Sequence, residues 1–492
     1  MDSLLKGSCT VIFSLLVTLS FSDPLGVFAQ VSGSAGVPNV TLPGAQSPFL
    51  GSAAEGKATA DVLQIDFKDA IDRGLRNNLG LLLAGDQAQT ARGERWKELS
   101  ELLPNVSGRI IENVQTQSLA ALGFEKLLPV LSPPGTNTSA FPHVVPAFNY
   151  FDARASLSQS LFNFKNLERE RAASESLKAA QFNFKDAREI VVLAVGNAYL
   201  QSIAAAARVE TAEAQVKSAQ ALYDKAADQQ RAGLTPAIDA LRSQVELQTR
   251  QQQLIVAQND LAKSSLSIAR IIGLPPGQQF ILTEKAPYQA LAPLPLEAYL
   301  LHAYAGRSDY QAAVAQLQSA ELSKRGAIAG RYPTVDLAAN YGDIGVTPAH
   351  SNGTWQVVGG VNIPIFAGNR VHSDVLEADA QLKQARSQLS DLRGRIDYEV
   401  RTALLDLNAA AQQVEVARSS VDLAEQALAQ SQDRFTAGVA DNLEVVQAQE
   451  AVAAAHENYI QSLYAHNLAK VELAYAIGDA EQGVRRFLKG NQ

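Results

Sequence analysis

Few side chains in this 492-residue sequence are arranged so that they could carry out covalent chemistry. Cys9 is the only cysteine, and no Ser/His/Asp arrangement, phosphate-binding loop or nucleotide-binding fingerprint rises above chance. Five of the six histidines lie beyond residue 300, scattered without the spacing of metal ligands: His302, His350, His372, His456 and His466. The sequence therefore predicts no catalytic residues, no metal site and no cofactor, and we expect the protein not to be an enzyme.

Two carboxylates nevertheless stand at matched positions. Asp239 lies six residues after Gly233, and Glu444 lies six residues after Gly438. Each carboxylate is expected in the first turn of a helix, where the helix dipole favours a negative charge. Helix structure alone is thus enough to account for both acids.

The two glycines lie in related stretches, RAGLTPAIDALRSQVELQ from Arg231 and TAGVADNLEVVQAQEAV from Thr436. Glycine suits the left-handed backbone conformation that closes a helix, so the chain is expected to turn back on itself at both places. The next helix is expected to start at once. Thr235 is expected to cap it in the first stretch, and Asp441 with Glu444 to form a capping box in the second.

These turns belong to a tandem duplication. Residues 173–273 align with residues 378–478 without a gap at an offset of 205, and the segment beginning at Leu103 aligns with the one beginning at Tyr332 at an offset of 229. We therefore divide the chain into a first repeat, residues 61–277, a second repeat, residues 278–480, and a C-terminal tail, residues 481–492.

Helical periodicity covers most of each repeat. An opening helix is predicted over residues 65–102 and again over 296–331, each ended by a proline. Long helices follow at 166–230 and 369–434, and return helices at 236–272 and 442–477. Each long helix would extend about 100 Å. The second carries apolar residues at intervals of seven, the pattern of a coiled-coil seam: Leu382, Leu389, Ile396, Ala403, Ala410, Ala417 and Ala424.

After each proline the apolar pattern changes to a period of two. Residues 151–158 and 355–363 alternate between apolar and polar side chains, as in strands that face lipid on one side and water on the other. A less regular strand precedes each, at 106–117 and 334–346. Four strands cannot close by themselves, and an open edge in lipid leaves backbone groups unpaired. Several chains must therefore share one barrel.

The N-terminus and the overall charge narrow the class of protein further. Residues 1–29 have the layout of a cleavable secretory signal peptide, and residues 30–60, rich in Gly, Ser, Pro and Ala, are expected to form a flexible leader. The formal net charge is −8 and no run of Lys or Arg suits a phosphate backbone, so no nucleic-acid partner is expected. The most apolar later window, Ile190–Ala207, is expected to be a buried helix.

Taken together, the paired glycine turns, the Ala/Gln-rich return helices and the striped strands resemble the TolC-like outer-membrane efflux family, over residues 61–480. The resemblance implies a mainly α fold with a membrane β-barrel. In it, three identical chains build one twelve-stranded barrel in the outer membrane, continued by a twelve-helix tunnel through the periplasm. The implied function is a passive exit duct of a tripartite efflux or type I secretion system. Its partners would be two further copies, a periplasmic adaptor, an inner-membrane transporter and outer-membrane lipid.

The resemblance also implies roles for the matched residues. Asp239 and Glu444 would form acidic rings at the periplasmic gate. Six turn residues would dock the hairpin of the adaptor: Ala232, Gly233, Leu234, Ala437, Gly438 and Val439. Ala440 and Gln447 depart from the residues that relatives often carry at the gate, which argues against a strong ionic lock.

A different class of protein also fits part of the pattern. A soluble periplasmic coiled-coil scaffold or adaptor would explain the long helices and the turns. It would not need apolar rows on strands 151–161 and 355–363, so the strands favour the duct. The sequence does not choose among drugs, metals and proteins as the transported substrate.

Overall fold

The computed structural model describes residues 47–489, apart from residues 55, 120, 122–143, 234, 285–287, 290, 292–293 and 441. The predicted signal peptide, the first part of the predicted leader and most of the segment between the first two strands lie outside the described residues.

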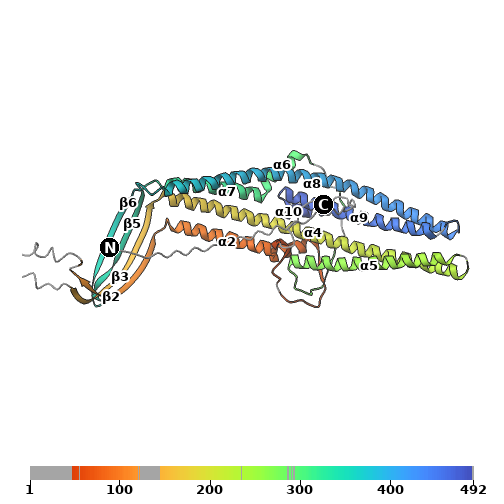
Figure 1. The fold of residues 1–492 in the computed structure, drawn as a ribbon, viewed down its shortest axis with the longest axis horizontal. Coiled ribbons are helices and arrows are strands. Elements are labelled where there is room, and N and C mark those ends of the chain that lie inside the picture. Colours follow the sequence, from red (N-terminus) through yellow and green to blue (C-terminus); the bar gives the residue numbers. More distant parts are fainter. Residues whose placement is uncertain are drawn as a thin grey trace, which may run out of the picture. The chain divides into compact units, whose positions relative to one another are not determined.

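Each repeat contributes a short strand, a broken opening helix, two long strands, a long helix and a return helix (Figure 1). In the first repeat these elements are β1 (Leu63–Ile65), α1 (Phe67–Asn77), α2 (Leu79–Ser100), β2 (Asn105–Ser118), β3 (Val144–Phe162), α4 (Phe164–Arg231) and α5 (Ala237–Ile272). In the second they are β4 (Phe280–Leu282), α6 (Leu296–Gly306), α7 (Ser308–Ala329), β5 (Thr334–Thr347), β6 (His350–Asn362), α8 (Arg370–Thr436) and α9 (Asn442–Ala476). A single turn, η1 (Pro48–Leu50), precedes the first repeat, and α10 (Ala480–Lys489) follows the second.

The opening helices differ from the prediction. Each is two helices rather than one, and they meet at Asn78 in the first repeat and at Arg307 in the second. Asn78 is fully buried; its Oδ1 accepts from the Gly80 amide at 2.9 Å and its Nδ2 donates to the Phe49 carbonyl at 2.7 Å. The prediction of one helix was wrong because this side chain caps α2, which apolar periodicity does not reveal.

The return helices end at glycines that pack against these breaks. Gly273 has a φ of 78°, and a Cβ there would lie 2.4 Å from the Cβ of Asn77. Gly478 has a φ of 72°, and a Cβ there would lie 2.6 Å from the Arg307 amide nitrogen. The repeated Ile-Gly ending thus serves both the left-handed turn and a close backbone approach.

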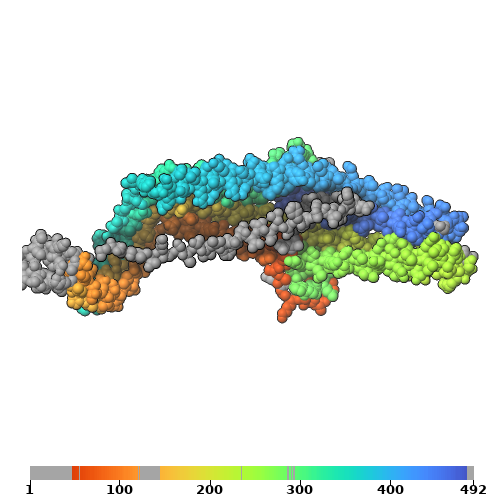
Figure 2. Space-filling model, viewed as in Figure 1, coloured from red at the N-terminus to blue at the C-terminus, as the bar shows by residue number. Residues whose placement is uncertain are grey.

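Helix α8 confirms the predicted seam at six of its seven positions, and the seventh, Ala424, is only partly buried. The residues of α8 at intervals of seven that are buried are Leu382, Leu389, Ile396, Ala403, Ala410 and Ala417. α8 packs along α9 and α7, and α4 packs along α2, α5 and α7. Toward the turns, α5 forms one side of the surface and α8 with α9 the other, with α4 visible between them (Figure 2).

The apolar core is uneven along these helices. The largest cluster joins α1, the middle of α4 and the ends of α5 and α9, and includes Phe67, Val195, Ile272 and Val471. Within the part of the chain that the structure describes, α4 is the one helix long and apolar enough to span a membrane, but 78% of its apolar window is buried in the protein. That burial is typical of a core helix, as the sequence predicted.

The four long strands form one antiparallel sheet in the order β2-β3-β5-β6. Pairing of β3 with β5 joins the two repeats, which the sequence did not predict. β1 and β4 make a separate parallel pair, in which Leu63 lies opposite Phe280; this pair was not predicted either. β2 and β6 are the two edge strands of the sheet.

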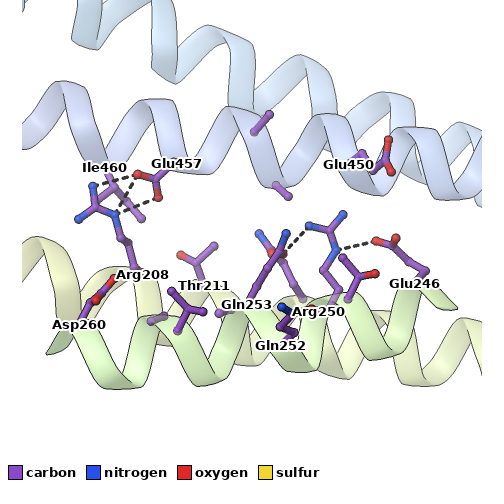
Figure 3. A pocket seen from close by; sticks show the side chains of 17 residues that line it. Arg208, Thr211, Glu246, Arg250, Gln252, Gln253, Asp260, Glu450, Glu457 and Ile460 are labelled. Atoms are coloured by element: carbon purple, nitrogen blue, oxygen red, sulfur yellow. Dashed lines mark hydrogen bonds and ion pairs between the residues drawn. The ribbon is translucent and has the colours of Figure 1, made fainter. Parts of the chain in front are cut away.

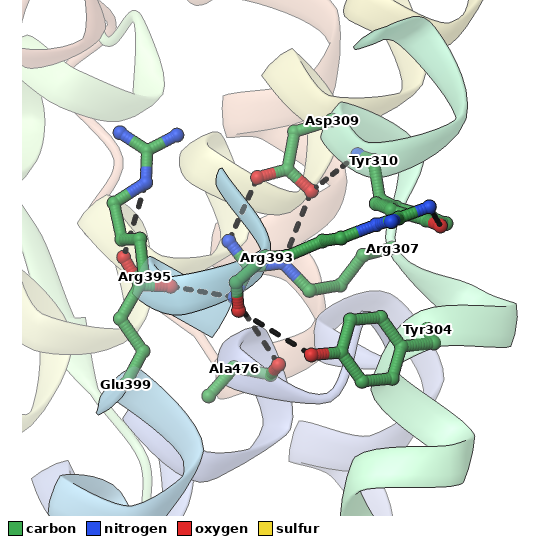
Figure 4. A network of polar contacts seen from close by, with 8 residues as sticks. All are labelled: Tyr304, Arg307, Asp309, Tyr310, Arg393, Arg395, Glu399 and Ala476. Carbon is green, nitrogen blue, oxygen red and sulfur yellow. Dashed lines mark hydrogen bonds and ion pairs between the residues drawn. The ribbon is translucent and has the colours of Figure 1, made fainter. Parts of the chain in front are cut away.

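A polar network fastens the break in the second opening helix (Figure 4). The buried Arg307 guanidinium bonds to the Asp309 carboxylate at 2.8 and 3.0 Å, to the Glu399 carboxylate of α8, and to the Ala476 carbonyl at the end of α9 at 3.2 Å. Residues of three helices, α7, α8 and α9, therefore bind one cation. Other ionisable groups near Arg307 affect the free energy of unfolding.

The Asp186 carboxyl on α4 lies near this network and gives a testable pH dependence. Burial raises the pKa of Asp186 to about 7 from an ordinary 3.8, and the neighbouring Asp309 charge adds to the rise. Between those pH values the folded state binds more protons than the unfolded state, so stability falls as the pH rises toward 7 and then levels off.

We expect Asp186→Asn to remove this penalty. Well above pH 7 the free energy of unfolding of the variant should exceed that of the unaltered protein by about 1–3 kcal/mol per chain, so the variant should unfold at a higher temperature. Near pH 4 the two proteins should unfold at nearly the same temperature. Thermal unfolding followed by circular dichroism at both pH values measures the difference. An equal effect at both pH values would contradict the assigned titration.

Candidate functional site

The candidate site has two parts, the glycine turns at one end of the long helices and the sheet at the other. In the second turn, the Gly438 amide donates to the Phe435 carbonyl at 3.1 Å and the Val439 amide to the Arg434 carbonyl at 3.0 Å. Gly438 has a φ of 72°. This is the paired hydrogen-bond pattern by which a left-handed residue closes a helix.

The first turn repeats the arrangement. Gly233 has a φ of 73°, and its amide donates to the Gln230 carbonyl at 2.9 Å. Apart from the adjoining residues, no heavy atom would lie within 4 Å of a Cβ at either glycine, and Ala232, Ala437 and Val439 are exposed. Leu234, the sixth predicted docking residue, lies outside the described residues. We call the described turn residues 232, 233, 437, 438 and 439 the tip.

The starts of the return helices depart from one prediction. Pro236 occupies the cap position of α5 and no side chain caps the helix, so the predicted Thr235 cap is wrong. The proline already fixes a suitable backbone angle and its successor begins the helix, which leaves the threonine one position too early. Asp441 lies outside the described residues, so the predicted capping box is not seen.

The structure places the two matched acids in different surroundings. The Asp239 side chain is 11% exposed, and its nearest cation is Arg242, 3.7 Å away. The Glu444 side chain is 36% exposed; it lies 3.2 Å from Arg434 and accepts from the Ser431 hydroxyl at 3.4 Å. Both arginines are largely exposed, so each ion pair contributes less than about 1 kcal/mol.

Asn442 joins the starts of the two helices that carry these acids, and it was not predicted. It is fully buried at the start of α9, where its Nδ2 donates to the Asp239 carbonyl at 2.9 Å and to the Ser243 hydroxyl at 2.6 Å. This side chain joins the start of α9 to the start of α5. The aligned position in the first repeat is Ala237, so the duplication gave no signal for it.

Between the tip and the main core, the hairpin of α4 and α5 faces the hairpin of α8 and α9 mainly through polar side chains. A cavity of about 780 Å³ lies among α4, α5 and α9 (Figure 3). Arg208 of α4 reaches across to Glu457 of α9 at 2.9 Å, while Arg250 and Glu246 of α5 form a buried pair at 2.6 Å. The apolar cluster near the tip is small and centres on Leu222, Phe435 and Val445. The hairpins are therefore held together more weakly here than at the core.

The sheet presents two different faces. Directly opposed residues share a face, so the register assigns every side chain. One face is largely apolar and includes Val106, Ile110, Leu157, Ala339, Tyr341, Trp355 and Val357. The other is largely polar and includes Ser107, Arg109, Arg154, Ser156, Asn340, Thr354 and Gln356. The apolar side chains are open in one chain, with Ile110 78%, Trp355 74% and Val357 59% exposed. This confirms the predicted alternation.

Known proteins resemble this chain in structure or in sequence. The CmeC outer membrane channel of Campylobacter jejuni superposes with a TM-score of 0.73 at 17% identity, over 92% of this chain and 97% of that one. The pyoverdine export outer membrane protein OpmQ of Pseudomonas aeruginosa is 24% identical over 65% of this chain and 67% of its own length. The toluene efflux pump outer membrane protein TtgC of Pseudomonas putida is 25% identical over 66% of this chain and 68% of its own length.

Long helical hairpins joined to a two-faced sheet define the class of outer-membrane channels. The family described as outer membrane efflux protein matches residues 146–274 and 301–479, most of both repeats. The chain belongs to that family, and it is an outer-membrane protein. The alternative of a soluble periplasmic scaffold or adaptor is therefore wrong.

Proposed function

We propose that three copies of this chain close one barrel and form the exit duct of a tripartite efflux system. The observation that carries the proposal is the sheet, which has an apolar face, a polar face and two edges, β2 and β6, without a partner strand in the described part of one chain. In lipid such edges must be paired, and β2 of one copy can pair with β6 of the next. Twelve strands leave a water-filled bore, whereas eight would be filled by side chains.

The partners follow from the two ends of the duct. The apolar face contacts outer-membrane lipid, and the tip docks a periplasmic adaptor that connects the duct to an inner-membrane transporter. Transporter and adaptor supply the energy, while this chain conducts substrates passively and catalyses no reaction. The repeats proposed at residues 61–277 and 278–480 each supply two strands and one hairpin to this assembly.

We place the periplasmic gate at Asp239 and Glu444. The apolar contact between the hairpins near the tip is small, which supports movement of the hairpin ends. Asn442 ties the start of α9 to the start of α5, which supports joint movement of the two acids. Because the arginine beside each acid is exposed, each of these ion pairs is weak, and several weak pairs rather than one lock would hold the entrance shut. The acids would also attract cations to the narrow end.

Single-channel recording in lipid bilayers tests the duct and the gate together. We expect the purified protein to give a small, cation-preferring conductance. The double variant D239A/E444A should give a larger conductance with less cation preference, because Arg242 and Arg434 lose their counter-charges. Absence of any conductance from the unaltered protein would contradict the duct, whereas unaltered selectivity in the double variant would contradict only the gate.

A further inference from the structure

Two arginines lie directly opposite each other in the sheet. The register pairs Arg109 of β2 with Arg154 of β3, and both side chains belong to the polar face. Like charges at directly opposed positions destabilise a sheet, so strand pairing does not explain why both residues are cationic. Arg109 lies four residues from the helical end of β2, about 13 Å along the strand.

One acid, Asp152, lies beside both cations, and its direct ion pair is with Arg154. The Asp152 carboxylate accepts two hydrogen bonds from the Arg154 guanidinium, one of them at 2.6 Å, and a third from the Tyr150 hydroxyl at 3.4 Å. Asp152 is 6% exposed. Among the residues that the structure describes, Arg109 lies in no ion pair, and it is exposed. This level of the polar face therefore carries two positive charges and one negative charge per chain.

The described positions around the two arginines add no further acid at this level of the polar face. Gly342 of β5 lies opposite Arg154, and a Cβ there would lie 2.1 Å from the Ala153 carbonyl oxygen and 2.5 Å from the Arg154 Cα, so the close approach of the β3 backbone requires a glycine and no β5 side chain stands beside Arg154. The other acid on the polar face of the described strands, Asp336, lies near the helical end of β5. Glu112 and Asp343 belong to the apolar face.

We propose that Arg109, with the Arg154–Asp152 pair beside it, forms a cationic ring inside the barrel that binds the carboxylate groups of organic anions as they leave. This inference rests on the proposed duct. Three copies would carry a net charge of three positive units at one level of the bore. A guanidinium presents donors in a fork that matches a carboxylate, so such a ring favours carboxylate-bearing solutes over cations of the same size.

Block of the channel by citrate tests the ring. Citrate is added to the compartment that the barrel faces, and the concentration that halves the current is measured for the unaltered protein, R109Q, R109K and E112Q. We expect R109Q to raise this concentration about fivefold, because the ring loses its uncompensated charges. R109K keeps the charge and should retain most of the block. E112Q changes the charge by one unit on the apolar face and should leave the block unchanged.

A chemical rescue makes the assignment specific to this position. In a background in which Cys9 is replaced by serine, R109C should lose the block, and 2-aminoethyl methanethiosulfonate should restore it by returning a positive charge to the same side chain. Equal block of the unaltered protein and R109Q, or failure of the reagent to restore the block, would overturn the ring. A protein that forms no channels at all would instead overturn the duct.

Discussion

Gly438→Val should leave trimers in the outer membrane and reduce adaptor-dependent export roughly tenfold. The reason is that the left-handed backbone conformation costs an L-residue about 1–2 kcal/mol, and a β-branched residue more. The native φ is 72°, and no heavy atom outside the adjoining residues would lie within 4 Å of a Cβ there, so the penalty comes from the backbone and not from a clash. The turn lies at the end of two long helices, and none of its residues belongs to the largest core cluster, so trimers should still assemble. Export of a reporter substrate by cells that contain the adaptor and transporter measures the effect.

Gly438→Asn separates backbone geometry from docking. Asparagine tolerates the left-handed conformation better than other L-residues, so G438N keeps the shape of the turn while adding a side chain. If export needs only the geometry, G438N should restore it. If the adaptor approaches the bare glycine closely, G438N should remain defective although its turn is intact. Unchanged export by G438V would remove the docking role of the tip.

Val357→Arg should abolish assembly, whereas Gln356→Arg, one residue away, should assemble normally. Val357 belongs to the apolar face and is 59% exposed in one chain, and Gln356 belongs to the polar face. An arginine facing lipid near the bilayer midplane costs about 2–4 kcal/mol, and three copies would each bear that cost. An arginine facing a water-filled bore remains hydrated and costs little.

Membrane fractionation followed by chemical cross-linking distinguishes the two variants. Both carry the same new charge at adjacent positions of one strand, so any difference between them reflects the face and not the residue type. Trimers of V357R in the outer membrane at the level of the unaltered protein would contradict the assignment of lipid to the apolar face. Loss of both variants would show instead that this part of β6 tolerates no added positive charge on either face.

Much of the fold could be predicted because it repeats. The long helix predicted over residues 369–434 is observed at Arg370–Thr436, and the strand predicted over 334–346 at Thr334–Thr347. Both carry periodic apolar patterns, of seven and of two residues, over long stretches. The tip glycines could be predicted because a left-handed residue is required there, and the structure confirms the positive φ of Gly233 and Gly438.

The features that could not be predicted depend on single side chains at contacts distant in sequence. Asn78 breaks the first opening helix by binding the Phe49 carbonyl, in a segment expected from its composition to be a leader. Asn442 joins α9 to α5 through the Asp239 carbonyl, across 203 residues. The opposition of Arg109 and Arg154 appears only once the register of β2 and β3 is known. No local pattern specifies any of these partners.

Disulfide cross-linking between the two edge strands tests the shared barrel most directly. In the Cys9→Ser background, one cysteine replaces Ser107 on β2 and a second replaces, in turn, Thr354, Gln356 or Val358 on β6. If copies of the chain close one barrel, at least one pair should give, on oxidation of the outer-membrane fraction, a ladder of covalent dimers and trimers that stops at three. A soluble monomer with no ladder, or a ladder that stops at two or continues beyond three, would contradict a barrel shared by three copies of the chain.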